Sequence, residues 1–252
     1  MNMKIGLSLN FKTLSLDGKF YVEMIDKYLC YEPTKLYIKA SSKNWNLKRH
    51  RKLIETFTAD KYFFFVSADN NGFMASTVNA VKKPFQRFYI AQDREVFNPS
   101  NTEIEHLIAR KGFSCAYLHD EKYEAQQSAL TEADYAMNSI PLRHAKGLPY
   151  KIDYAGRKIF DVSGNPGRSD RISSTELLAC WKMWFGEEFY KLVPKERILS
   201  FTEAFKMEEL ANDVVFVQLF EKVEDSATTK AQELQWSWRK WLNFDELIEK
   251  NP

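Results

Sequence analysis

The stretch Met3–Phe11, MKIGLSLNF, decides the class of fold that we predict for this chain of 252 residues. Its apolar side chains alternate with small or polar ones from Ile5 to Phe11. That two-residue period is typical of a strand with one buried face. A strand at the start of the chain is therefore the first predicted element, and the segments after it decide what accompanies it.

Helical and strand patterns alternate along the next 130 residues. Strands are predicted at 35–39, 61–67, 85–92 and 113–118, and helices at 18–30, 47–58, 101–111 and 120–138. The helix at 101–111 has the clearest start, because Ser100 and Glu103 have the spacing of a capping box. Residues 73–81 fit neither period. This order predicts an α+β (mixed α/β) fold, in which helices cover a mixed or antiparallel sheet.

Residues 139–149 form a seam with two prolines, one glycine and little periodicity. We therefore expect an N-terminal α/β lobe (1–145) and a C-terminal α+β lobe (146–252), with one continuous domain as the alternative. In the second lobe the patterns predict a hairpin over 150–162, a helix over 172–192 with Gly186 as an interruption or C-cap, a helix beginning at Pro194, a strand at 214–222 and a helix at 226–242.

The composition places the chain among folded proteins. It is 44% hydrophobic and has no run of 18 apolar residues, so no transmembrane helix is predicted. The first residues do not have the pattern of a secretory signal. Cys30, Cys115 and Cys180 are odd in number and far apart, which argues against a disulfide framework and favours a reducing cytoplasm.

Charge is distributed unevenly although the formal net charge is only +2. Residues 1–100 carry 16 basic and 9 acidic side chains, and the last 52 residues carry 6 basic and 11 acidic ones. This asymmetry predicts a basic face at one end and an acidic face at the other. The acidic end suits an inhibitor of a basic protein, and solubility is the alternative explanation.

One enzyme hypothesis rests on the predicted hairpin. Asp153, Lys158 and Asp161 could hold a divalent metal ion and stabilise an attacking water, as a metal-dependent nuclease requires. A solvated charged face of an antiparallel hairpin explains the same residues. A second candidate is the cluster His119-Asp120-Glu121, for which an N-cap at Asp120 is the alternative. We predict no catalytic residues, no metal site and no cofactor.

Two segments could contact anions. The loop Ser163–Arg168 has flexible backbone and one arginine, but it lacks the glycine spacing of a phosphate-binding loop. The basic run Lys48–Lys52 would point around more than half of a helix, so only two or three of its side chains could face one nucleic-acid backbone. A plain loop and a solvated helix face are the preferred interpretations, and nucleic acid is not an expected partner.

Tryptophan is concentrated after residue 180. In the predicted helix at 226–242, Trp238 and Trp241 lie on the apolar stripe and are expected in the core. Trp236 falls about 200° from Leu234 and thus lies away from that stripe. An exposed tryptophan at this position would be an anchor for a protein partner, and packing against another element is the alternative.

Four segments of the C-terminal hundred residues resemble bacterial immunity proteins of polymorphic toxin systems, in particular the immunity protein 52 group. They are FDVSGNPGR (160–168), ELLACWKMWFGEEFYKLVPKERILSF (176–201), VVFVQLFEKVED (214–225) and QWSWRKWLNFDEL (235–247). The resemblance implies a cytoplasmic, non-enzymatic protein that binds a cognate toxin, at a ratio of 1:1, and blocks it.

The mechanism implied by the resemblance requires complementary surfaces rather than a catalytic group. The acidic C-terminal segment is the surface that we expect to bind the toxin. Its predicted contact residues are Trp236, Glu224, Asp225, Asp245, Glu246 and Glu249. A metal-dependent enzyme acting on nucleic acid and a scaffold protein of a mobile element are the alternative hypotheses.

Overall fold

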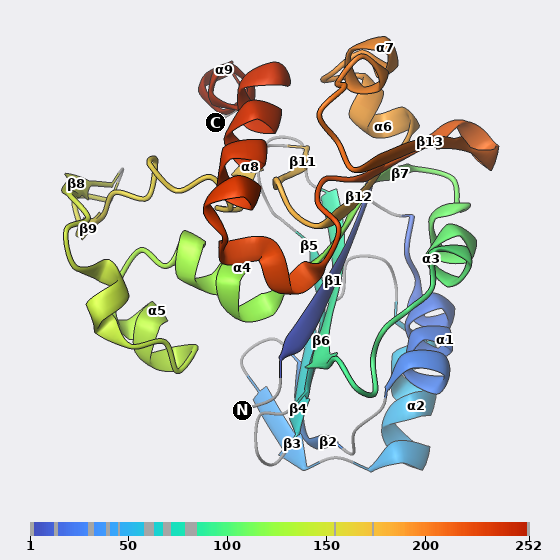
Figure 1. Cartoon of the computed structure of the whole chain (residues 1–252). Helices are drawn as coiled ribbons and strands as arrows, with labels where there is room; N and C mark the ends of the chain where they lie inside the picture. The colour runs from blue at the N-terminus through green and yellow to red at the C-terminus, as the bar shows by residue number, and fades with distance from the viewer. Residues whose placement is uncertain are drawn as a thin grey trace.

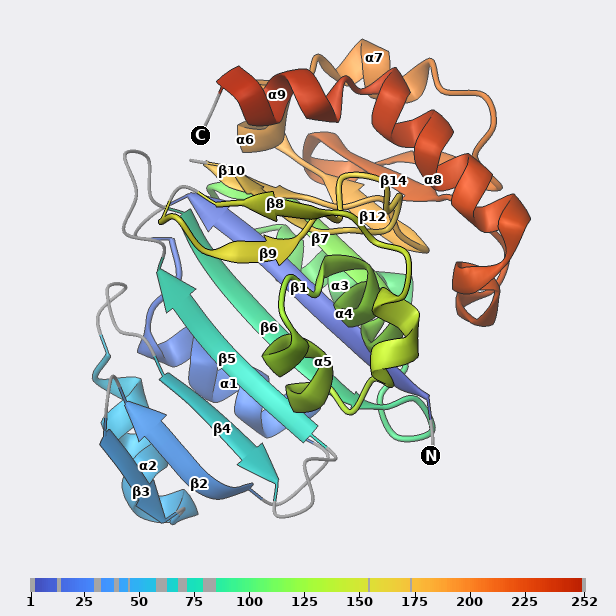
Figure 2. The same ribbon diagram turned by 90° about the vertical axis from the view of Figure 1, so that its left-hand side faces the viewer.

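One antiparallel sheet of ten strands organises the molecule, as Figures 1 and 2 show. The computed structural model describes residues 3–12, 15–29, 33–38, 41–44, 46–57, 63–67, 72–78, 85–153, 155–172 and 174–250. Within them the strand order is β13-β14-β12-β7-β1-β6-β5-β4-β2-β3. The ten strands are β1 (Lys4–Lys12), β2 (Pro33–Ile38), β3 (Ser41–Asn44), β4 (Phe63–Ser67), β5 (Gly72–Val78), β6 (Phe85–Asp93), β7 (Phe113–Asp120), β12 (Lys182–Phe185), β13 (Lys206–Leu210) and β14 (Val214–Gln218).

Helices and two small hairpins cover the sheet. In Figure 1 one face is covered by α1, α2 and α3, and the other by α4, α8 and the β10–β11 hairpin, while α5 and the β8–β9 hairpin project beyond α4. The helices are α1 (Gly18–Tyr28), α2 (Leu47–Glu55), α3 (Asn101–Ile108), α4 (Glu121–Ser128), α5 (Glu132–Met137), α6 (Glu187–Tyr190), α7 (Lys195–Leu199), α8 (Thr229–Trp241) and α9 (Phe244–Lys250). The hairpins pair β8 (Tyr150–Ile152) with β9 (Lys158–Phe160), and β10 (Asp170–Ile172) with β11 (Thr175–Leu177). The α+β prediction is therefore confirmed.

The N-terminal predictions are confirmed in type and place. The strand predicted at 3–11 is β1, and Ser100 and Glu103 form the capping box of α3. The segment 120–138 contains two helices, α4 and α5, and the undecided residues 73–81 begin with β5. Strands from both predicted lobes share the sheet, because β12 pairs with β7.

The helix predicted at 172–192 is wrong. This segment forms β10, β11 and β12, followed by the short helix α6, and Gly186 is the N-cap of α6 rather than a C-cap. Every residue from Thr175 to Trp181 is buried. A mostly apolar run that is buried throughout fits a strand buried on both faces as well as a helix, so periodicity alone misassigned it.

The aromatic residues of α8 confirm half of the core prediction. Trp238 is fully buried, and its ring lies 5.0 Å from that of Phe201 and 5.8 Å from that of Phe185. Trp241 keeps 42% of its surface exposed because it lies at the last turn of the helix. Cys115 and Cys180 are buried free thiols, whereas Cys30 lies outside the described residues.

Gly18 sets the distance between α1 and α2. A Cβ at this position would lie 2.1 Å from the carbonyl oxygen of Ile54 and 2.6 Å from that of Glu55. These are backbone atoms of the last turn of α2, so they cannot move aside as a side chain would. The absence of a side chain at Gly18 is what allows the two helices to meet.

We predict that Gly18→Ala destabilises the protein by about 1–3 kcal/mol, since it forces the two helices apart. Urea unfolding measures the change. Gly164→Ala is the control, because a Cβ there meets no atom within 4 Å. Equal midpoints for the two variants would contradict the proposed contact.

Candidate functional site

The predicted partner-binding residues lie in two places rather than one. Glu224 and Asp225 belong to the 3-10 helix η3 (Val223–Ala227), directly before α8. Asp245, Glu246 and Glu249 belong to α9, beyond the other end of α8. Thirteen helical residues separate the two groups, a length of about 20 Å at 1.5 Å per residue. In Figure 1, α9 lies at one end of α8, and the chain enters the helix at the other.

The first group is partly engaged within the chain. Glu224 forms an ion pair with Arg94, which follows β6.

Trp236, the remaining predicted contact residue, is half-buried, and the guanidinium carbon of Arg168 lies 5.9 Å from the centre of its ring. Trp236 therefore lies off the apolar stripe, as predicted, but it packs beside another element instead of standing free.

The second group forms an exposed acidic surface, which we call the α9 patch: Asp245, Glu246 and Glu249. The carboxyl group of Asp245 is 70% exposed, although Arg168 binds it at 2.8 Å. A hydrogen bond from Lys250 and the charge of that lysine lower the pKa of Glu246. Glu246 is thus ionised at neutral pH, and all three residues of the patch are accessible from solvent.

Buried arginines fix the position of the α9 patch. Arg168 donates to the carbonyl oxygens of Ser163 (2.6 Å) and Asn165 (3.1 Å) as well as to Asp245. Arg239 of α8 is also buried and donates to the carbonyl oxygen of Arg168 at 3.1 Å and to Asp170. The loop at 163–168 therefore uses its arginine to hold α8 and α9, and this agrees with the plain-loop interpretation.

The hairpin carboxylates of the nuclease hypothesis are each bound to a cation of their own. Asp153 accepts from Arg157 at 2.7 Å, and Asp161 accepts from Lys151 at 3.1 Å. Lys158 lies over the ring of Tyr150, 4.1 Å from its centre. The described residues include no group of three His, Cys, Asp or Glu side chains placed to hold a metal ion. The arrangement is that of a charged hairpin surface.

The cluster His119-Asp120-Glu121 is divided by the fold. Asp120 is the N-cap of α4 and accepts a hydrogen bond from the backbone N–H of Tyr123 at 3.0 Å. His119 is only 3% exposed and stacks on Tyr89, with ring centres 6.1 Å apart. Neither of its ring nitrogens has a hydrogen-bond partner among the described residues.

In the basic run of α2, His50 is buried and the Arg51 side chain pairs with Asp26 at 2.6 Å. The other four residues of the run, Lys48, Arg49, Arg51 and Lys52, are exposed and line one surface pocket with Asn46 and Glu55.

A buried polar cluster on the α4 side of the sheet was missed by the sequence analysis. At its centre is Glu176 of β11, which is 1% exposed. One oxygen of its carboxylate accepts from the Ser169 hydroxyl at 2.7 Å. The other accepts from Ser8 at 2.9 Å and lies 3.3 Å from the Nε atom of Arg87. Glu176 is the lone acidic side chain in the segment Thr175–Trp181, and this isolation is the one signal that could have revealed it.

Electrostatics at the cluster follow from burial and from two arginines. Burial alone would raise the pKa of Glu176, but the charges of Arg87 and Arg171 outweigh it and hold the pKa at about 2. Burial raises the pKa of Glu124 to about 7 and lowers that of His119 to about 4. Both carboxylate oxygens of Glu176 have partners, and these bonds attach β11 to the sheet. The pKa of Glu124, about 7, means that this side chain exchanges its proton near neutral pH.

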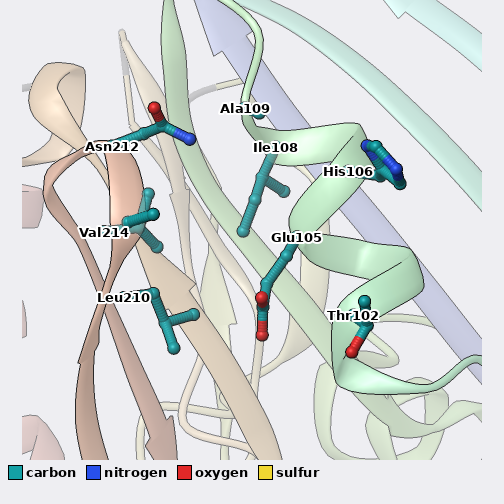
Figure 3. Close-up of a pocket in the computed structure, with 9 residues that line it drawn as sticks. Thr102, Glu105, His106, Ile108, Ala109, Leu210, Asn212 and Val214 are labelled. Atoms are coloured by element: carbon teal, nitrogen blue, oxygen red, sulfur yellow. The ribbon is translucent and has the colours of Figure 1, made fainter.

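A shallow pocket of 230 Å³ lies between α3 and the turn that joins β13 to β14. Figure 3 shows Glu105 and Ile108 of α3 extending toward Leu210 and Val214, while His106 points away from the strands. The lining is mostly apolar. In the turn, Asn212 and Asp213 have positive φ angles of 59° and 57°.

Comparison with protein-family models, with curated proteins and with solved structures finds no match to this chain. Among the described residues, every helix is too short or too polar to cross a bilayer.

Removal of the charge of Glu176 tests the buried cluster. We predict that Glu176→Gln costs about 3–5 kcal/mol of stability, since it leaves the largely buried Arg87 guanidinium without its counter-ion. Glu224→Gln removes the same charge from an exposed pair and should cost no more than about 1 kcal/mol. Denaturant unfolding of both variants measures the difference, and comparable losses would show that the cluster is not a stabilising network.

His119 makes the free energy of unfolding depend on pH in the acidic range. Its folded pKa of about 4 lies below the ordinary value of 6.5, so the neutral form is favoured by folding. This contribution is fully present above pH 6.5 and is lost as the pH falls through 4. We predict that wild type loses about 3 kcal/mol relative to His119→Leu over that window, measured by unfolding at a series of pH values. If the stability of the two proteins changed equally with pH, the lowered pKa of His119 would be contradicted.

Proposed function

We propose that this chain is a non-enzymatic immunity protein that binds a cognate bacterial toxin at 1:1 and neutralises it. The proposal rests on the resemblance of the C-terminal segments to immunity proteins and on one structural observation. That observation is the α9 patch, an exposed acidic surface held in place by buried arginines. A metal-dependent enzyme remains an alternative without a structural observation in its favour.

Rigidity of the surface around the α9 patch supports a binding function. Arg197 of α7 donates to the carbonyl oxygen of Trp241 at 2.6 Å, and the Trp241 indole donates back to that of Arg197 at 2.7 Å. These reciprocal bonds hold the end of α8 against α7. A surface that is ordered before binding loses little conformational entropy in the complex.

Charge defines the kind of partner. Residues 187–213, which contain α6, α7 and β13, carry seven acidic and four basic side chains, and α9 adds further carboxylates. A negative surface attracts a basic protein over several ångströms and raises the association rate at low salt. We therefore expect the toxin to present a basic surface, as proteins that cut nucleic acids commonly do.

The experiment is co-expression of the tagged chain with the product of each neighbouring gene, followed by capture and a growth assay. The expected result is capture of one protein at 1:1 that arrests growth when expressed alone and does not when this chain is present. Capture of nothing, or of nucleic acid alone, would refute the proposal.

Charge reversal then tests the surface. Glu246→Lys with Glu249→Lys should slow association with the captured toxin at least tenfold at low salt, an effect that added salt reduces. Glu55→Lys with Glu95→Lys is the matched control, because it changes the net charge equally at exposed positions outside α9. Equal rates for the two double variants would exclude the α9 patch as the interface.

A further inference from the structure

Residues 130–161 form a module that projects from the sheet. It contains α5, the 3-10 helix η1 (Leu142–Ala145) and the β8–β9 hairpin, which lie at the left of Figure 1 and in front of the sheet in Figure 2. A small core separate from the main one supports it, with Tyr135 and Phe160 in edge-to-face contact at 5.8 Å. The module is therefore an ordered platform of its own.

Exposed apolar side chains are concentrated on this module. Among the described residues, eight large hydrophobic side chains are exposed, and five of them lie between residues 130 and 152. Tyr150 and Ile152 of β8 are 55% and 67% exposed and lie on the same face of the strand. The others in the module are Leu130, Met137 and Leu142. Exposed apolar side chains that are concentrated in one small module, rather than scattered singly over the protein, are typical of a protein interaction site.

The outer edge of β8 is open for strand pairing. The backbone N–H of Asp153 donates to the carbonyl oxygen of Arg157, and that of Asp161 donates to the carbonyl oxygen of Pro149. Hydrogen-bonded pairs alternate along an antiparallel ladder, so Lys151 and Ile159 form the hydrogen-bonded pair between these two. The backbone N–H and C=O groups of Tyr150 and Ile152 therefore point away from β9. No hydrogen bond from the described part of the chain reaches them. The edge strand β13 differs, since it carries Lys206, Glu208 and Glu209, and charge protects an edge from pairing.

Three exposed cations of the module have no ion pair with a described residue. Arg143 and Lys146 of the segment before β8 are exposed and form no ion pair with a described residue, and Lys158 contacts only the ring of Tyr150. The carboxylates of Asp153 and Asp161 are already bound to Arg157 and Lys151. Lys158, beside Tyr150 of β8, is thus a positive charge without a counter-ion among the described residues, which favours a partner with acidic side chains.

We propose that β8 binds an extended, acidic segment of a protein partner, which adds a third strand to the β8–β9 hairpin. Main-chain hydrogen bonds to Tyr150 and Ile152 hold the segment, their side chains pack on its apolar residues, and Lys158 attracts its carboxylates. Addition of a strand to a free sheet edge is a recurrent mode of peptide recognition. The proposal does not depend on the identity of a toxin.

The test uses three fluorescent ten-residue peptides and the full chain, with anisotropy as the readout. In the first peptide valine alternates with glutamate, and in the second it alternates with lysine. The third peptide has the sequence of the first except for one proline at its centre. Wild type should bind the first peptide at least tenfold more tightly than the other two. Equal affinities, or no binding at millimolar peptide, would overturn the proposal.

Two variants identify the edge. Ile152→Pro removes an outward N–H without removing a bond to β9, and it should weaken binding of the glutamate peptide at least tenfold. Lys158→Glu should weaken that peptide and strengthen the lysine peptide, a gain that misfolding cannot produce. Phe205→Ala, which removes an exposed aromatic side chain outside the module, is the control and should bind as wild type does.

Other occupants of the edge would give different results. If anionic phospholipid vesicles recruit wild type but no peptide binds, the module is a membrane contact and the proposal fails. If the mass in solution rises with protein concentration and Ile152→Pro abolishes the rise, a second copy is the occupant and the proposal also fails.

Discussion

The polar face of the central strand β1 constrains the rest of the structure. Ser8 and Asn10 are fully buried on the face opposite the apolar one, so their polar atoms lie away from water inside a sheet of ten strands. A buried polar group costs free energy unless it is hydrogen-bonded. Glu176, 168 residues further along the chain, accepts the hydrogen bond of Ser8. The Ser8 hydroxyl therefore reaches its acceptor only when the β10–β11 hairpin has folded over β1, whereas the Oδ1 atom of Asn10 has no partner among the described residues.

This constraint explains which elements could be predicted from the sequence. Periods of two and of 3.6 residues revealed β1 and α3, whose opposite faces differ in polarity along the element. They failed at 172–192, because Trp184 and Phe185 of β12 are both buried, on opposite faces of the sheet. The hydrophobic pattern of a segment does not indicate which other strand it pairs with, so the pairing of β12 with β7 could not be predicted from it.

The candidate surfaces were predictable to a similar degree. The angle of Trp236 on its helix was correct, but the approach of Arg168 depends on a loop that folds back from residue 168 onto α8. Neighbouring acidic residues in the sequence were grouped as one face, although α8 separates Glu224 from Asp245. The β8–β9 hairpin was predicted from its turn, whereas its free edge depends on how far the module projects, which only the three-dimensional structure defines.

The α9 patch and the β8 edge are linked through one loop. Residues 161–168 lead from β9 to Arg168, whose side chain binds Asp245 of α9, and Asn165 donates to the carbonyl oxygen of Gln127 in α4 at 2.9 Å. The loop between the two surfaces is therefore attached to α4 and to α9 without a partner. A protein that contacts both surfaces, with a basic surface on α9 and an acidic strand on β8, loses less conformational entropy than it would if the loop were unattached. Opposite charge at the two surfaces also fixes its orientation, because the reversed arrangement places like charges together.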